Sequence, residues 1–249
     1  MHIASRSRLR TTATAAALAL LTAGLSGCLL SPSTSGQNGG AHPGSPVSVT
    51  AFSDHPAQSA LASAAASARS LRGARVLFST TGVEDLTASS YAANIVAEPA
   101  SAAGSGNLLI NGERSQTDFR IEDGRLWIKS VDGTFEDVAA ARGNLDPTAL
   151  LDPATGLAAM LEAVTAAEFL RLQPEGPSST VAGRATVKMH AQLPEKAATL
   201  LLPATAVAGH GPLPVTLWLD PTAGGYDLVQ LIAEVGEGSM TLTVASASH

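Results

Sequence analysis

The clearest chemistry in this sequence is the acylation of a thiol. Cys28 is the only cysteine of the 249 residues, and it directly follows Leu25-Ser26-Gly27. An apolar run, Ala13–Leu21, precedes these small residues, and three arginines lie within the first ten positions. This order is typical of a secretory signal peptide, and Leu-Ser-Gly-Cys is typical of a lipobox. A plain signal peptide with an incidental Cys28 is the alternative.

Acylation of Cys28 divides the chain into three parts. We expect residues 1–27 to be the signal peptide, residues 28–53 to be the lipidated cysteine with a flexible tether, and residues 54–249 to form a single domain. The tether is rich in Ser, Gly and Pro and carries too little apolar surface to fold. The apolar run is too short for a stable membrane span. The sequence therefore predicts a lipoprotein held by its acyl anchor on the outer, periplasmic face of a cell membrane.

Other chemistry is not indicated. The sequence has no G-x-S-x-G elbow, no H-E-x-x-H, no phosphate loop and no dinucleotide fingerprint. His190 falls on the polar side of a predicted strand, and His210 lies in a Gly-His-Gly-Pro loop. Asp146 and Asp152 each precede a proline, which favours helix capping over paired catalytic carboxylates. We expect no enzyme activity, no catalytic residue, no metal site and no cofactor.

Charge excludes one class of partner. The whole chain carries a formal net charge of −6, and removing residues 1–27 leaves 12 basic and 21 acidic residues, a net charge near −9. Such a protein is not a nucleic-acid binder and is not drawn to anionic headgroups by its overall charge. Its attachment to the membrane is therefore assigned to Cys28.

The domain opens with a predicted helix and continues with strands. Apolar residues recur at helical spacing behind a possible cap at Ser53 or Asp54, and Gly73 is expected to end this helix; they are Leu61, Ala64, Ala65, Ala68 and Leu71. From Arg75 the period changes to two, as in strands with one dry and one wet face. The dry positions are Val76, Phe78, Phe119, Ile121, Leu126, Ile128, Val187, Met189, Ala191, Leu193, Met240, Leu242 and Val244.

One hairpin can be predicted in register. Asp123-Gly124 is a two-residue turn signal. Folding there places Ile121 opposite Leu126 and Phe119 opposite Ile128 on the dry face. The wet face then pairs charges of opposite sign, Glu122 with Arg125 and Asp118 with Lys129. If Asn111-Gly112 makes a similar turn, Leu108 and Ile110 join the same dry face; a longer loop would break this inference.

Helices are expected between the two groups of strands. The segment from Asp146 to Ala167 is predicted to be helical, with Leu157, Met160 and Leu161 on its apolar surface, and Pro194–Leu202 is a shorter helix. Trp127 and Trp218 fall out of phase with their apolar neighbours and are expected on the outer face of the sheet. The order of elements predicts an α+β domain with helices gathered on the dry face of a curved antiparallel sheet.

Three segments together resemble the LppX/LprG-type lipoproteins of mycobacteria and related actinobacteria. They are Asp123–Trp127, Leu150–Leu157, which has an L-x-P-x-T-G-L pattern, and Pro212–Trp218. Gly183-Arg184 also fits, and the likeness covers about residues 54–245 in addition to the lipobox. The resemblance implies a half-barrel antiparallel sheet with helices over its concave face, enclosing a large apolar cavity.

The resemblance also implies a function and a set of residues. Such proteins carry multiply acylated lipids and lipoglycans across the periplasm or load them onto a membrane exporter. Leu108 matches a family position that lines the cavity, and the other implied lipid-binding residues are Ile110, Phe119, Ile121, Leu126 and Ile128 on the sheet with Leu157, Met160 and Leu161 in the helical lid. Ordinary core packing is the alternative for each of these side chains.

The chain also departs from the family pattern. It has a shorter hairpin around Gly112, a divergent segment 165–179 and no long tail after the last strand. The hypothesis drawn from the sequence is a lipid-anchored carrier of acylated lipids. The main alternative is a surface lipoprotein that modulates a membrane sensor or assembly through protein contacts, with a filled core; a hydrolase is a distant third.

Overall fold

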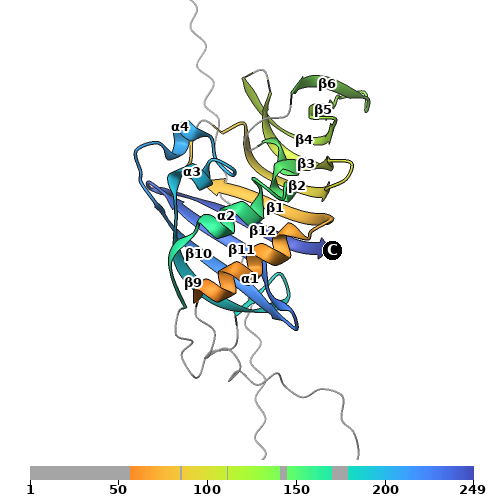
Figure 1. Cartoon of the computed structure of the whole chain (residues 1–249). Helices are drawn as coiled ribbons and strands as arrows, with labels where there is room; N and C mark the ends of the chain where they lie inside the picture. The colour runs from red at the N-terminus through yellow and green to blue at the C-terminus, as the bar shows by residue number, and fades with distance from the viewer. Residues whose placement is uncertain (1–56, 85, 111, 141–144, 170–178) are drawn as a thin grey trace, which may run out of the picture. The chain divides into compact units, whose positions relative to one another are not determined.

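The computed structural model describes residues 57–84, 86–110, 112–140, 145–169 and 179–249. In this part of the chain one antiparallel sheet carries short helices over one of its faces (Figure 1). The predicted signal peptide, Cys28 and the tether lie outside the described residues. So does the proposed cap at Ser53 or Asp54.

The sheet has twelve strands, all paired antiparallel. Eleven of them follow the order β6-β5-β4-β3-β2-β1-β12-β11-β10-β9-β7, and β8 pairs with β9 beside this path. Their bounds are β1 Gly73–Thr81, β2 Ala88–Val96, β3 Ser101–Ile110, β4 Glu113–Glu122, β5 Arg125–Lys129, β6 Phe135–Ala140, β7 Thr165–Phe169, β8 Ser179–Val181, β9 Arg184–Leu193, β10 Leu213–Thr222, β11 Gly225–Val235 and β12 Gly238–Ser248.

Among the residues that the structure describes, the sheet is open, because its two end strands, β6 and β7, do not pair with each other. The first and last strands, β1 and β12, meet in the middle of the sheet. The chain must therefore pass from one end of the sheet to the other between β6 and β7. The 3-10 helix η3, Pro147–Leu151, and the helix α2, Leu157–Ala163, lie on this crossing, and η3 lies against β2 and β3.

The first predicted helix is confirmed, but it ends earlier in the sequence than predicted. Helix α1, Ala57–Arg69, buries Leu61 and four alanines at helical spacing, as the sequence indicated. The prediction that Gly73 ends the helix is wrong, since Gly73 opens β1. The helix ends at Arg69. In the turn that follows, the amide of Ser70 donates a hydrogen bond to the carbonyl of Ser67.

The long helix predicted from Asp146 to Ala167 is wrong in two places. Asp146 does cap the first part, since its carboxylate accepts the amide of Thr148 at the start of η3. A turn then separates η3 from α2, and Thr165–Phe169 is the edge strand β7. This segment pairs with β9 as an edge strand instead of adding a further turn to α2, so tertiary structure overrides the local pattern here.

The second predicted helix is confirmed in part. Helix α3, Glu195–Ala198, lies inside the predicted range Pro194–Leu202. A further short helix, α4, Ala204–Val207, was missed in the sequence. All the dry positions of the strands are buried, and they form one hydrophobic core with the inward residues of α1, η3 and α2. The antiparallel sheet with helices on one face is thereby confirmed.

Candidate functional site

The hairpin of β4 and β5 has the predicted register on its inner face. Phe119 lies opposite Ile128 and Ile121 opposite Leu126, and all four side chains are buried in the core. Asp123 and Gly124 both have positive φ, as a two-residue turn of the primed type requires. The four apolar residues predicted at this end of the sheet therefore share one continuous surface.

The outer face of the same hairpin is held by polar contacts. The predicted pair of Asp118 and Lys129 is confirmed at 3.2 Å. Glu122 faces Arg125 in register, but Arg125 forms its ion pair with Asp137 of β6 instead. The next strand offers a closer carboxylate, which the hairpin sequence alone did not reveal.

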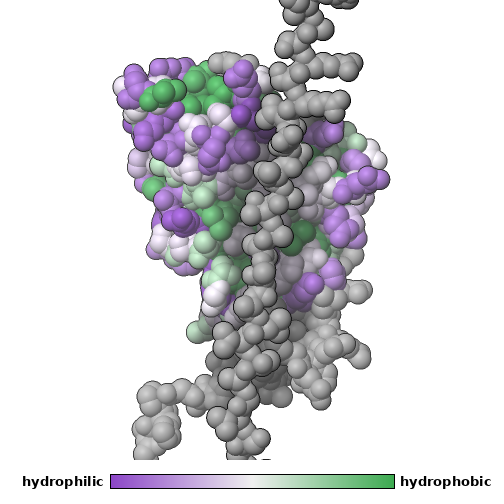
Figure 2. Space-filling view, turned by 180° about the vertical axis from the view of Figure 1, so that it is seen from behind, coloured by the Kyte–Doolittle hydropathy of each residue, from purple (hydrophilic) through white to green (hydrophobic). Residues whose placement is uncertain are grey.

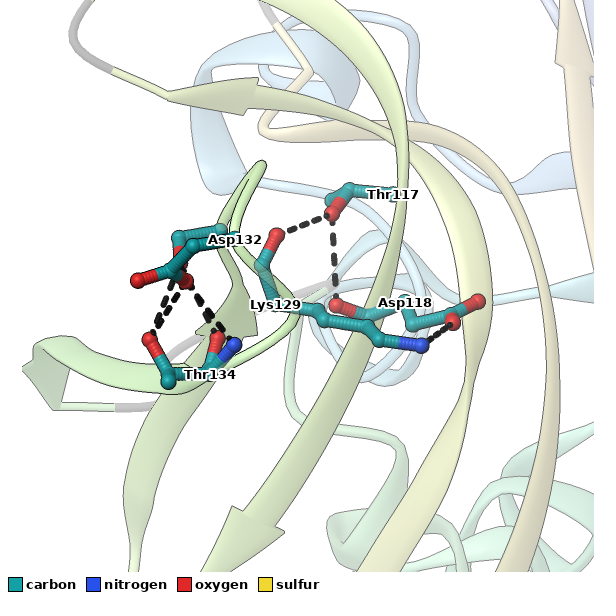
Figure 3. A network of polar contacts seen from close by, with 6 residues as sticks. Thr117, Asp118, Lys129, Asp132 and Thr134 are labelled. Atoms are coloured by element: carbon teal, nitrogen blue, oxygen red, sulfur yellow. Dashed lines mark hydrogen bonds and ion pairs between the residues drawn. The ribbon is translucent and has the colours of Figure 1, made fainter.

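A small network closes this end of the sheet (Figure 3). Thr117 donates through its hydroxyl to the carbonyl of Lys129 at 3.2 Å. In the turn before β6, Asp132 accepts hydrogen bonds from the hydroxyl of Ser130 and from the amide and hydroxyl of Thr134. These donors, the Ser130 hydroxyl first, lower the pKa of Asp132 to about 2. These hydrogen bonds account for the shape of the turn, so the role of Asp132 is structural.

Leu108 and Ile110 join the inner face, as a short turn at Asn111-Gly112 predicted. Strand β3 ends at Ile110 and β4 begins at Glu113, with Ile110 and Glu113 paired. Asn111 itself lies outside the described residues. Leu108 is fully buried, whereas Ile110 is partly buried and packs against the core.

An aromatic group lies at the centre of the inner face. The rings of Phe78 and Tyr91 stack with their centroids 5.0 Å apart, and Tyr91 meets Phe119 edge-on at 6.3 Å. Burial, together with the nearby negative charge of Asp146, raises the pKa of Tyr91 well above its ordinary value. Tyr91 therefore stays neutral, and the inner face of the sheet remains uncharged here.

Helix α2 covers the inner face with the predicted residues. Leu157, Met160 and Leu161 are all buried. Gly156 directly precedes the helix at a position where a Cβ atom would lie 2.5 Å from the carbonyl oxygens of Leu150 and Asp152. Only glycine fits there, which explains the glycine of the L-x-P-x-T-G-L segment.

The turn before α2 is fixed by one carboxylate. Asp152 accepts hydrogen bonds from the amides of Ala154 and Thr155, both at 2.8 Å. These two bonds, that from Thr155 first, lower the pKa of Asp152. The role predicted for Asp152 is therefore corrected: it closes the turn between η3 and α2, while Gly156 stands at the cap position of α2.

An open pocket of about 670 Å³ lies between α2 and α3, and we call it the α2–α3 pocket. Both helices are on the near side of the molecule in Figure 1. Small and apolar side chains predominate in its lining, which consists of Ala154, Thr155, Ala159, Met160, Ala163, Pro194, Lys196, Ala197, Thr199 and Leu200. Met160 is the one predicted lipid-binding residue among these, and it also belongs to the buried core.

The pocket could not be found from the sequence. Ala159, Ala163, Ala197 and Leu200 carry no signal that separates them from ordinary helix residues. The other eight predicted residues do not line the pocket; seven of them are buried in the core and Ile110 is partly buried against it. The structure thus brings the predicted residues together in one apolar core and has an open pocket on the helical side of that core.

The back of the molecule has a different character. Hydrophilic side chains gather over β4–β6 around a smaller hydrophobic group (Figure 2). Trp127 and Trp218 are half-buried on the outer face, as predicted, with Arg120 stacked over Trp127 and Lys188 over Trp218. Each tryptophan is therefore covered by a cation from its own sheet.

The histidines take the positions expected of them. His190 and His210 are exposed, and the imidazole of His190 is 3.1 Å from the hydroxyl of Thr216. Within the described residues no group of three or more His, Cys, Asp or Glu side chains could hold a metal ion. No helix in this part of the chain is long and apolar enough to cross a membrane.

Comparison with known proteins adds a family and named relatives. The family model described as "LppX_LprAFG lipoprotein" matches residues 56–248. The lipoarabinomannan carrier protein LprG of Mycobacterium tuberculosis (strain H37Rv) is 27% identical over 184 residues, covering 72% of this chain and 74% of that protein. LprG of Mycobacterium bovis (strain AF2122/97) matches at the same identity and coverage.

Two solved structures share the fold. The crystal structure of LprF from M. bovis superimposes with a TM-score of 0.66 at 23% identity, covering 77% of this chain and 92% of that one. The crystal structure of the M. tuberculosis lipoprotein LppX gives a TM-score of 0.57 at 21% identity, covering 78% of this chain and 96% of the other. At these identities the likeness concerns the fold alone.

Proposed function

This chain belongs to the LppX_LprAFG lipoprotein family, and we propose that it is a lipid-anchored carrier of acylated lipids. In this proposal the acyl chains bind non-covalently in the apolar interior between sheet and helices. The protein then takes part in moving its lipid toward the outer cell envelope. The name of its relative LprG, a lipoarabinomannan carrier, supports this class of ligand.

One observation carries the proposal. A continuous apolar core runs from the β4–β5 hairpin to β9–β12 under α1, η3 and α2, and Met160 of this core also lines the open α2–α3 pocket. An open, mainly apolar pocket beside such a core suits a ligand with long hydrocarbon chains. Each buried CH₂ contributes about 0.8 kcal/mol, so binding needs no catalytic residue.

The finer features of the carrier are part of the proposal. We infer that the sheet acts as a half-barrel whose concave side holds the lipid. Leu108, Ile110, Phe119, Ile121, Leu126 and Ile128 would line it from the sheet, and Leu157, Met160 and Leu161 from the helical lid. A closed carrier that binds tightly cannot deliver its lipid, so release requires an opening of the lid or a partner such as a membrane exporter.

The anchor completes the proposal. Acylation of Cys28 after removal of residues 1–27 would hold the domain at the outer face of the cell membrane by its tether. One acyl chain alone gives reversible attachment, and stable anchoring needs more than one chain. The carrier would therefore stay beside the membrane from which it takes its lipid.

The test is mass spectrometry of the full chain, expressed in a mycobacterial host and extracted in detergent. Under native conditions the protein is expected to carry a defined extra mass, which denaturation releases as acylated lipid. The denatured protein should keep the acyl groups bound covalently at Cys28. Leu108→Trp, which fills the proposed cavity, is expected to lower the released lipid several-fold while circular dichroism shows an intact sheet.

The opposite result is equally clear. A native mass without released lipid, in a protein that also takes up no offered glycolipid, would overturn the carrier proposal and favour the alternative of protein contacts with a filled core. Should Leu108→Trp fail to fold, Ala159→Leu in the α2–α3 pocket serves as the second variant, because Ala159 is only partly buried.

A further inference from the structure

The α2–α3 pocket has a single charged side chain in its lining, Lys196. Lys196 is exposed, whereas Met160 at the other side of the pocket is buried. The lysine therefore stands at the mouth and the methionine at the floor. A positive charge at the mouth of an apolar pocket is the arrangement that an amphiphile with an anionic end requires.

Lys196 has no ion pair within the described residues, whereas six of the other nine basic residues described there do. Its backbone carbonyl accepts the hydroxyl of Thr199, and its ammonium group has no acidic partner there. Glu195 is its neighbour in α3, but adjacent helix residues do not face each other. By contrast, the following basic residues are all paired with carboxylates: Arg69, Arg72, Arg120, Arg125, Lys129 and Arg184.

Building on the proposed carrier function, we propose that Lys196 makes the α2–α3 pocket selective for acylated lipids whose headgroup carries a phosphate, over neutral lipids with the same chains. The lysine ammonium is a compact charge with three donors, which suits a phosphate oxygen. The apolar walls take the beginning of the acyl chains. The phosphate remains at the edge of water, where its solvation is retained.

A free anion is not the occupant that the pocket favours. One exposed lysine offers a single charge, and the remaining lining is formed mainly by alanine, methionine, proline and leucine. The whole chain has a net charge of −6, so its overall field repels small anions. Lys196 can hold a phosphate only when the attached hydrocarbon brings it there.

The experiment compares two lipid probes that differ in one group. Phosphatidic acid and diacylglycerol with identical acyl chains are offered together, in equal amounts, in phosphatidylcholine vesicles. Lipid bound to the full-length protein is then counted by native mass spectrometry. The wild-type protein is expected to take up about 5- to 10-fold more phosphatidic acid than diacylglycerol, and this ratio should fall as salt is raised.

Three variants isolate the role of Lys196. Lys196→Met should bring the ratio close to one, chiefly by lowering the uptake of phosphatidic acid, and Lys196→Arg should keep most of the preference. Lys188→Met is the matched control, because Lys188 lies over Trp218 on the outer face and its loss changes the net charge by the same amount. Its ratio should equal that of the wild type.

Each contrary result points to a different failure. The proposed selectivity is wrong if the wild-type protein takes up both lipids equally, if Lys196→Met keeps the preference for phosphatidic acid, or if Lys188→Met loses it. None of these three results affects the proposed carrier function. If neither lipid is taken up, the proposed function fails together with this inference. If millimolar inorganic phosphate displaces phosphatidic acid without affecting diacylglycerol, Lys196 binds free anions and the headgroup assignment is wrong.

Discussion

Helices α1 and α2 both cover the apolar face of the sheet, and these two covers differ in how closely they pack against their neighbours. Helix α1 presents four buried alanines and packs against β11 and α2. Its contact is so close that a Cβ atom on Gly225 of β11 would lie 1.8 Å from the hydroxyl oxygen of Ser63. The amide of Tyr226 donates to the same hydroxyl at 3.1 Å. Helix α1 therefore packs closely against β11.

Helix α2 is also rich in alanine, yet its junction with α3 remains open. Ala159 and Ala163 face the α2–α3 pocket, and the opposite wall is formed by Pro194, Ala197 and Leu200. Small side chains allow close approach only when the opposing surface is equally small. At Ser63 of α1 the opposing surface is Gly225 and the backbone of Tyr226, whereas across the pocket from α2 it is a proline ring and a leucine. We therefore expect ligand to enter past α2 and α3 while α1 stays in place.

The largest difference between the two sides should appear on truncating one leucine of α1 and one leucine that lines the α2–α3 pocket. Leu61 of α1 is 1% exposed, so Leu61→Ala should lower the free energy of unfolding by about 2–5 kcal/mol. Leu200 is only partly buried beside the pocket, so Leu200→Ala should cost about 1 kcal/mol. Urea unfolding followed by circular dichroism measures both.

The two leucine variants control for each other, since the chemical change is identical. Equal m-values would show that both unfold from comparable native states. If Leu200→Ala cost as much as Leu61→Ala, the α2–α3 side would be as tightly packed as α1, and the contrast between the covers would be lost.

Enlarging one alanine in each helix gives the next largest effect and tests the fit directly. Ala64 of α1 is fully buried, and Ala64→Leu should destabilise the protein by about 1–3 kcal/mol through overpacking. Ala159→Leu projects into the pocket and should change stability by no more than about 0.5 kcal/mol. It should also lower the amount of bound lipid, as measured by mass spectrometry.

A stable Ala64→Leu variant would mean that α1 has room to move. In that case α1 and α2 would pack equally loosely over the core, and ligand entry could not be assigned to the α2–α3 side. Ala158→Leu is a useful companion, because Ala158 lies on the same helix as Ala159 but is buried and should behave like Ala64.

The sequence predicted best where two independent patterns agreed. Apolar alternation and charge pairing both required the same register around Asp123-Gly124, and the structure has that register. The buried positions of the long strands followed from period two alone, because each has one face on the core. Leu157, Met160 and Leu161 were likewise found by their helical spacing.

The remainder depended on contacts distant in sequence. Thr165–Phe169 follows helix α2 along the chain, but it pairs with β9 and is a strand. Arg125 was matched to the nearest carboxylate in its hairpin, whereas a third strand supplied Asp137. The α2–α3 pocket is set by how far Ala159 lies from Leu200, and no pattern along the chain encodes that distance.

The smallest expected effect concerns acid and the rim of the pocket. Asp152 holds the amides of Ala154 and Thr155, two residues of the pocket lining, and these bonds lower its pKa from the ordinary value of 3.8. A lowered pKa means that the stabilisation is present above pH 3.8 and is lost as the pH falls through the lower folded-state value. Because Asp152 is exposed, the loss should be less than about 1 kcal/mol.

This effect should be local to the open cover. In a pH titration followed by NMR, the amide signals of Ala154 and Thr155 should shift below pH 3.8, while the amides of α1 stay unchanged. Asp152→Asn keeps an oxygen acceptor but has no titrating proton, so its two amide signals should not move. Equal shifts in α1 and at the rim would mean that acid loosens both covers together. The α2–α3 side would then differ from α1 only in its shape, because the turn at Asp152 would be no more sensitive to acid than α1.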